Sequence, residues 1–213
     1  MSRFLSLLLL FISLYPLSAQ SQSSRGQTKN GKPVGVWEYY DGKELGLKFD
    51  HDSSRIQYAR PDTASYLVLV DSVWKVQKLD RAPRLLGSHG ELLMAMGKKL
   101  RYPTIGDIAN RVTGTVVLTY VIDQYGNKTT PIATTTPTVS LAEEVYRVVE
   151  SIPIRYLPAI YQGRPTPVKV AFVVRFIACK TKEECQKTGK ALALSVPMPL
   201  GSIGEMIVTL NTY

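Results

Sequence analysis

Residues 168–177, with the sequence VKVAFVVRFI, decide the fold. One parity of this stretch is wholly apolar and consists of Val168, Val170, Phe172, Val174 and Phe176. The other parity is mixed and consists of Lys169, Ala171, Val173, Arg175 and Ile177. Because successive side chains of a strand point to opposite faces, the alternation predicts a β-strand that packs one face on a core.

Two further strands are predicted upstream of this stretch. Residues 114–123, GTVVLTYVID, have one strongly apolar parity and one mixed parity, as expected for a strand covered on one side. Residues 124–127 supply turn chemistry, and the Thr-rich residues 128–135 are predicted to return as a second strand.

Two amphipathic helices accompany the strands, at residues 88–100 and 140–152. Each opens with a capping-box pattern, which pairs Ser88 with Glu91 and Ser140 with Glu143. Residues 88–177 therefore run helix, strand, strand, helix, strand. This order predicts an α+β domain, a small antiparallel sheet with two helices packed on one face.

A β-hairpin-rich region is predicted at residues 30–80. Asn30-Gly31 and Asp41-Gly42 are turn dipeptides that bracket an aromatic run, which is typical of a hairpin. The stretch resembles MORN-like repeats, with a degenerate second copy at residues 47–58. Such units need neighbours, so we expect the hairpins to lean on strands within residues 65–79 and their aromatic side chains to serve packing rather than a ligand cage.

The N-terminus predicts export. Arg3 precedes an apolar run at residues 4–14, and small residues up to Ala19 follow, which is typical of a signal peptide at residues 1–19. We expect a flexible leader at residues 20–29 and a periplasmic or secreted protein. The alternative is an uncleaved segment that anchors the chain in the inner membrane.

Export also bears on the only two cysteines, Cys179 and Cys185. They lie close in sequence, so an oxidising compartment favours a small-loop disulfide over two free thiols. They open a C-terminal extension, residues 178–213, whose segment 205–210 is strand-like. This extension could add an edge strand to the sheet or cover one.

The amino-acid composition excludes several classes of function. The chain has 213 residues, and 26 Lys and Arg against 17 Asp and Glu give a formal charge of +9. Its densest basic region, residues 81–101, suits either a solvated helix face or an anionic envelope surface, whereas export argues against nucleic acid. With two His and no catalytic motif, the sequence predicts no enzyme, no metal site and no cofactor.

Short motifs across residues 88–177 resemble, in their order, the C-terminal domain of TonB-type energy transducers in the form common in Bacteroidetes-like envelopes. The motifs are Leu100-Arg101-Tyr102-Pro103, Val112 to Val117, Tyr120 to Gly126, Leu141 to Glu144 leading to Val148 to Pro153, Tyr156 to Ala159, and Gly163-Arg164-Pro165 before the 168–176 strand. Tyr156 stands where the family usually has Trp or Phe, and its hydroxyl needs a partner.

The resemblance implies a protein that binds a partner protein or peptide by β-strand addition, with a segment of an outer-membrane TonB-dependent receptor as the implied partner. Strand 168–176 is then the expected accepting edge. Its candidate residues are Val168, Lys169, Val170, Ala171, Val173 and Arg175.

Two other functions remain open at this stage. One is a membrane-anchored TonB energy transducer that uses residues 4–17 as its anchor, and the other is a MORN-like structural or surface interaction module. A homodimer is also possible.

Overall fold

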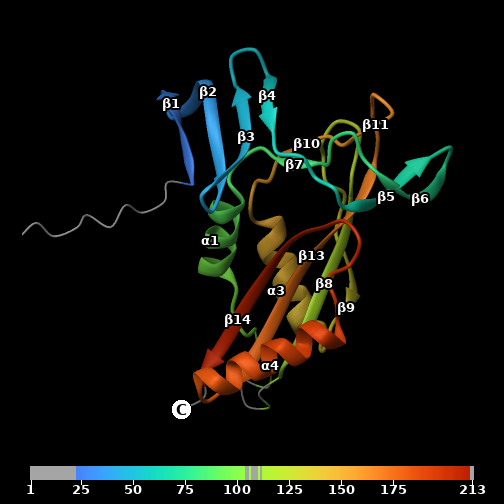
Figure 1. The fold of residues 1–213 in the computed structure, drawn as a ribbon. Coiled ribbons are helices and arrows are strands. Elements are labelled where there is room, and N and C mark those ends of the chain that lie inside the picture. The colour runs from blue at the N-terminus through green and yellow to red at the C-terminus, as the bar shows by residue number, and fades with distance from the viewer. Residues whose placement is uncertain (1–22, 104–105, 107–109, 111, 212–213) are drawn as a thin grey trace, which may run out of the picture.

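The structure, a computed structural model, describes residues 23–103, 106, 110 and 112–211. The predicted signal peptide, residues 1–19, lies outside them. The described chain is α+β, with two main sheets, two short strand pairs and three named helices in that part of the molecule (Figure 1). Among the described residues, every helix is too short or too polar to cross a membrane.

The first sheet is a four-stranded antiparallel meander. Its strands, in the order β1-β2-β3-β4, are Ser24–Lys29, Lys32–Asp41, Glu44–Asp50 and Arg55–Ala59. The first turn has positive φ at Asn30 (52°) and Gly31 (74°), as the predicted hairpin dipeptide requires. A small core holds Tyr39, Leu47 and Phe49, so the aromatic side chains of Tyr39 and Phe49 serve packing as expected. The predicted flexible leader instead supplies β1 from Ser24 onward.

The second sheet carries the predicted 168–177 strand at its centre. Its strands are β5 (Ser65–Val70), β6 (Val73–Lys78), β8 (Gly114–Ile122), β9 (Ile132–Thr135), β13 (Val168–Cys179) and β14 (Ser202–Asn211). The order is β6-β5-β13-β8-β9, and β14 pairs with β13. The β5–β6 hairpin joins this sheet through the pair Val68 and Val168. The apolar side chains that pack on the core of the first sheet come from that sheet and from Leu86 and Leu157, so our expectation that residues 65–79 support the N-terminal hairpins is wrong.

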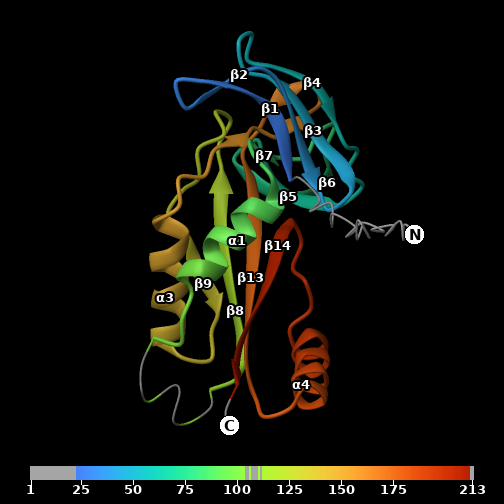
Figure 2. The ribbon, with the colours of Figure 1, turned by 90° about the vertical axis from the view of Figure 1, so that its left-hand side faces the viewer.

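Two helices cover one face of this sheet, as the sequence predicts. They are α1 (His89–Lys99) and α3 (Val139–Glu150), and both bury apolar residues in the core with the even-numbered side chains of β13 (Figure 2). Ser88 is the N-cap of α1 and accepts from the Glu91 amide, as predicted. The N-cap of α3 is Thr138 rather than Ser140, and its hydroxyl accepts from the Leu141 amide.

A third helix, α4 (Lys182–Ser195), lies on the opposite face and buries none of its own residues. It connects β13 to β14, which run parallel (Figure 2). Parallel neighbours need a crossover connection, usually a helix, and α4 provides it.

Two short strand pairs lie outside these two main sheets. They are β7 (Arg84–Leu85) with β10 (Tyr156–Leu157), and β11 (Ile160–Tyr161) with β12 (Arg164–Pro165). The Tyr156 hydroxyl finds the partner it needs in Tyr120, whose hydroxyl oxygen lies 2.7 Å away. Gly126 (φ +86°) allows its loop to approach this site, because a Cβ there would lie 2.0 Å from the Tyr156 carbonyl oxygen.

Candidate functional site

The accepting edge expected from the sequence is not an edge. Strand β13 pairs antiparallel with β8 on one side, and on the other side it pairs with β5 at its start and with β14 from Ala171 to Cys179. Its backbone groups are therefore committed within the molecule. The prediction is corrected for all six residues, which are Val168, Lys169, Val170, Ala171, Val173 and Arg175.

The two charged residues of the expected edge have internal roles. The ammonium group of Lys169 lies 4.5 Å from the centre of the Trp74 ring in β6, a cation–π contact that ties the two strands together. Arg175 is only 2% exposed. Neither side chain is available to select a partner peptide.

Arg175 holds the C-terminal end of α4 on the sheet. Its guanidinium donates to the carbonyl oxygens of Leu192 and Val196, each at 3.0 Å, and forms an ion pair with Glu205 of β14. A cation at a helix C-terminus is stabilising because the last carbonyls carry partial negative charge. The buried arginine therefore links β13, α4 and β14.

The other end of α4 is held covalently. Cys179, the last residue of β13, and Cys185, in the first turns of α4, form the predicted disulfide, with their Cα atoms 5.3 Å apart. Because α4 buries little apolar surface itself, these two attachments fix its position. A disulfide of this kind agrees with an oxidising compartment.

Strand β14 is the exposed edge of this side of the sheet. Among the described residues, no strand pairs with the side of β14 that faces away from β13. The strand is ten residues long, SIGEMIVTLN, with one charged residue, no lysine and no proline. Proteins usually protect an edge strand with lysine or other charged residues, with proline, or by keeping the strand short, and β14 has little of this protection. The edge strand β9 has four residues, and β6 carries Lys75 and Lys78.

The backbone of β14 presents alternate amides to solvent. The Ala171 amide donates to Gly201, and the register pairs Val173 with Glu205. The odd-numbered residues of β13 therefore direct their backbone groups toward β14. In a parallel ladder, this register turns the amides of Glu205, Ile207 and Thr209 away from β13. An added strand would bond to these three residues.

Grooves flank β14 on both faces. The groove toward α4 has a volume of about 860 Å³ and includes Ile177, Gly189 and Ile207. The groove toward α1 has about 520 Å³ and includes Gly97, Met206 and Val208. The Ile207 side chain is 57% exposed, which is high for so apolar a residue. Alternate side chains of an added strand would enter the two grooves in turn.

The walls of these grooves are basic. Lys180, Lys182 and Lys190 line the α4 side, and Arg101 lines the α1 side. The carboxylate that reaches the grooves from β14, Glu205, is already paired with Arg175. The local charge therefore complements an acidic segment.

Comparison with family models, with curated proteins and with solved structures finds no match to this chain. Among the described residues, no group of three or more His, Cys, Asp or Glu side chains could hold a metal ion.

Sequence reasoning left open whether the extension adds an edge strand, and β14 confirms that it does, but the accepting edge was predicted one strand too early, on β13. A signal was present, since a strand, a helix over residues 182–195 and a further strand form the order of a parallel crossover unit. Reading the extension in this way would have placed β14 beside β13.

Proposed function

We propose that this chain is an exported cell-envelope protein that binds an extended segment of a partner protein by strand addition on the outer edge of β14. The observation that carries the proposal is the unprotected ten-residue edge with a groove on each face. In strand addition, main-chain hydrogen bonds provide affinity, and pockets for alternate side chains provide selectivity.

The resemblance of residues 88–177 to the C-terminal domain of TonB-type transducers supports the same mode of binding. It suggests a periplasmic segment of an outer-membrane receptor as the partner. The appended strand β14 moves the accepting edge outward by one strand, so the proposal no longer involves β13.

The grooves favour a particular partner chemistry. Apolar side chains at alternate positions would contact Ile207 on one face and Met206 on the other. Acidic residues at the ends of the segment would lie near Lys182 or Arg101. We therefore expect an acidic segment with alternating apolar residues, and affinity that falls as salt rises.

Amide hydrogen exchange tests the proposal directly. The probes are synthetic peptides that copy the periplasmic N-terminal segments of outer-membrane receptors from the same organism, each with a scrambled control. Binding should slow exchange at the outward amides of Glu205, Ile207 and Thr209. Slowed exchange at β6 or β9 instead, or at no strand, would refute the β14 edge.

A matched pair of variants sharpens this test. Ile207→Pro removes one outward amide and leaves the inward ladder to β13 intact, because proline is tolerated where the amide faces solvent. It should abolish peptide binding, whereas Ile207→Val, which keeps the amide, should bind as the original does. A dimer that Ile207→Pro dissociates would identify a second copy of the chain as the occupant and contradict the proposal.

The form in which the protein acts depends on residues 1–19. Mass spectrometry of the protein from a cell-envelope fraction distinguishes a mature chain that begins at Gln20 from an anchored one. An intact N-terminus would favour the membrane-anchored transducer.

A further inference from the structure

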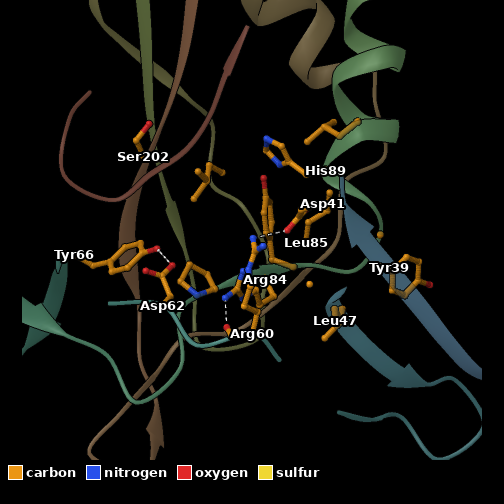
Figure 3. A pocket seen from close by; sticks show the side chains of 16 residues that line it. Tyr39, Asp41, Leu47, Arg60, Asp62, Tyr66, Arg84, Leu85, His89 and Ser202 are labelled. Carbon is orange, nitrogen blue, oxygen red and sulfur yellow. Dashed lines mark hydrogen bonds and ion pairs between the residues drawn. The ribbon is translucent and has the colours of Figure 1, made fainter. Parts of the chain in front are cut away.

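A second candidate site, separate from the β14 edge, lies at the junction of the two main sheets. A cavity of about 300 Å³ is enclosed there by the N-terminal sheet, the β7 connector, the first turn of α1 and the start of β14 (Figure 3). This volume is at the small end of the range for ligand pockets. The side chains of Arg60 and Asp41 are 34% and 32% exposed, so the cavity reaches solvent on their side.

Most of the charged groups around the cavity are already paired. Arg60 forms ion pairs with Asp41 at 2.9 Å and with Glu44 at 2.7 Å. Asp62 accepts from the Tyr66 hydroxyl at 2.7 Å and from the Ala64 amide at 2.8 Å. These groups neutralise or satisfy one another.

Arg84 is the exception. Its guanidinium donates to the carbonyl oxygen of Arg60, and within the described residues no carboxylate lies at ion-pair distance from it. Its Nε is buried and has no hydrogen-bond partner there. Arg84 as a whole is half-buried, so it is the buried Nε that matters: an unsatisfied buried donor commonly marks the place of an ion or ligand.

Other groups around the cavity match an anion that also has an apolar part. His89 and Ser202 lie across the cavity from Arg84 (Figure 3), and both can donate hydrogen bonds. Burial lowers the pKa of His89, so its ring is neutral at neutral pH. Leu85 and Leu92 supply apolar walls.

We propose that this cavity binds a small organic carboxylate, with Arg84 as its counter-ion. The planar guanidinium fork of arginine matches the two oxygens of a carboxylate. A phosphate fits less well, because Asp41 and Asp62 also line the cavity and would repel its second charge.

Titration with benzoate and with the uncharged isostere benzamide tests the proposal. Both are followed by NMR on the full mature chain, with inorganic phosphate as a third probe. Benzoate should bind saturably and shift the resonances of Arg84 and His89, and benzamide should bind about tenfold more weakly or not at all. Equal binding of benzamide, tighter binding of phosphate, or no saturable binding of benzoate would overturn the proposal.

Variants at Arg84 distinguish the effect of its charge on benzoate binding from an effect on folding. Arg84→Gln should weaken benzoate binding by about tenfold or more, and Arg84→Lys should retain part of it, because the charge remains but the fork is lost. Arg164→Gln, which removes an exposed arginine in β12, is the matched control and should bind benzoate normally. Normal benzoate binding by a folded Arg84→Gln protein would refute the role of Arg84.

Discussion

Replacing Arg175 with methionine should destabilise the protein by about 3 kcal/mol. The substitution removes hydrogen bonds to the Thr115 hydroxyl at 3.1 Å and to the carbonyl oxygens of Leu192 and Val196 at 3.0 Å. It also removes the ion pair with Glu205. Hydrogen bonds from a charged donor contribute about 1.5–3 kcal/mol each.

The net effect is smaller than the sum of these contacts. Methionine does not have to be desolvated as a buried guanidinium does. The two carbonyl groups lie at the C-terminal end of α4, a helix that buries none of its residues, so water can replace the lost donor. Glu205 has 38% of its side chain exposed, so it is not left as a buried unpaired charge. We therefore expect about 3 kcal/mol, the low end of the range for a broken buried ion pair.

Urea unfolding followed by circular dichroism measures this change as a lower midpoint with an unchanged slope. The matched control is Glu205→Gln, which removes the charge of the exposed partner and leaves the three other bonds of Arg175 in place. Gln keeps a side-chain oxygen that can accept from the guanidinium but removes the counter-charge of a buried arginine, so the variant should cost about 2 kcal/mol, less than Arg175→Met. If Glu205→Gln costs as much as Arg175→Met, the ion pair rather than the attachment of α4 is the dominant contribution, and the reasoning fails.

Three further predictions follow from other contacts. The double substitution Cys179→Ser with Cys185→Ser should lower the free energy of unfolding by about 2 kcal/mol, because the bridge closes a short loop. The urea midpoint of this variant should match that of the original chain after reduction. If neither midpoint differs from that of the oxidised original chain, the disulfide does not stabilise the fold. Burial lowers the pKa of His89 below its ordinary 6.5, despite the opposing charge of Asp41, so the unfolded state binds more protons and stability should fall as pH drops through this region. His89→Gln should reduce that loss in urea unfolding between about pH 8 and pH 5, although His51, whose pKa is also lowered by burial, keeps part of it. Tyr120→Phe should cost about 1–3 kcal/mol, because it leaves the buried hydroxyl of Tyr156, whose pKa burial raises to about 12, without its partner. Adding Tyr156→Phe should recover part of the cost, and a fully additive double variant would argue against a direct hydrogen bond.

The features of the second sheet that were predictable depend on residues close together in the chain. The alternation over 168–177 identified the face of β13 that packs under α1 and α3, but it did not predict that the other face is buried as well. The Ser88 cap was correct because the hydroxyl and the Glu91 amide lie within one helical turn. The cap of α3 was wrong by two residues because Thr138 and Ser140 are both good capping residues, and local sequence does not choose between them.

The candidate site was less predictable because pairing partners are not local. Arg175 has the spacing of a solvent-facing charge, yet its partners are on β14, on α4 and in β8. Burial of a charged side chain depends on such distant partners, and periodicity does not reveal them. Arg84 is similar, since only the junction of two sheets surrounds it with a cavity.

The attachments of α4 bear on how a partner would engage the sheet. A guest strand could in principle displace β14 and pair with β13 instead. Displacement would break nine registered residue pairs, expose Met206 and Val208 and strain a connection held by a disulfide at one end and Arg175 at the other. Addition outside β14 breaks none of these contacts and gains hydrogen bonds to amides that now face solvent. The free-energy difference therefore favours addition over exchange, and the disulfide-free variant, in which one attachment is lost, should bind peptides at β14 as the original chain does.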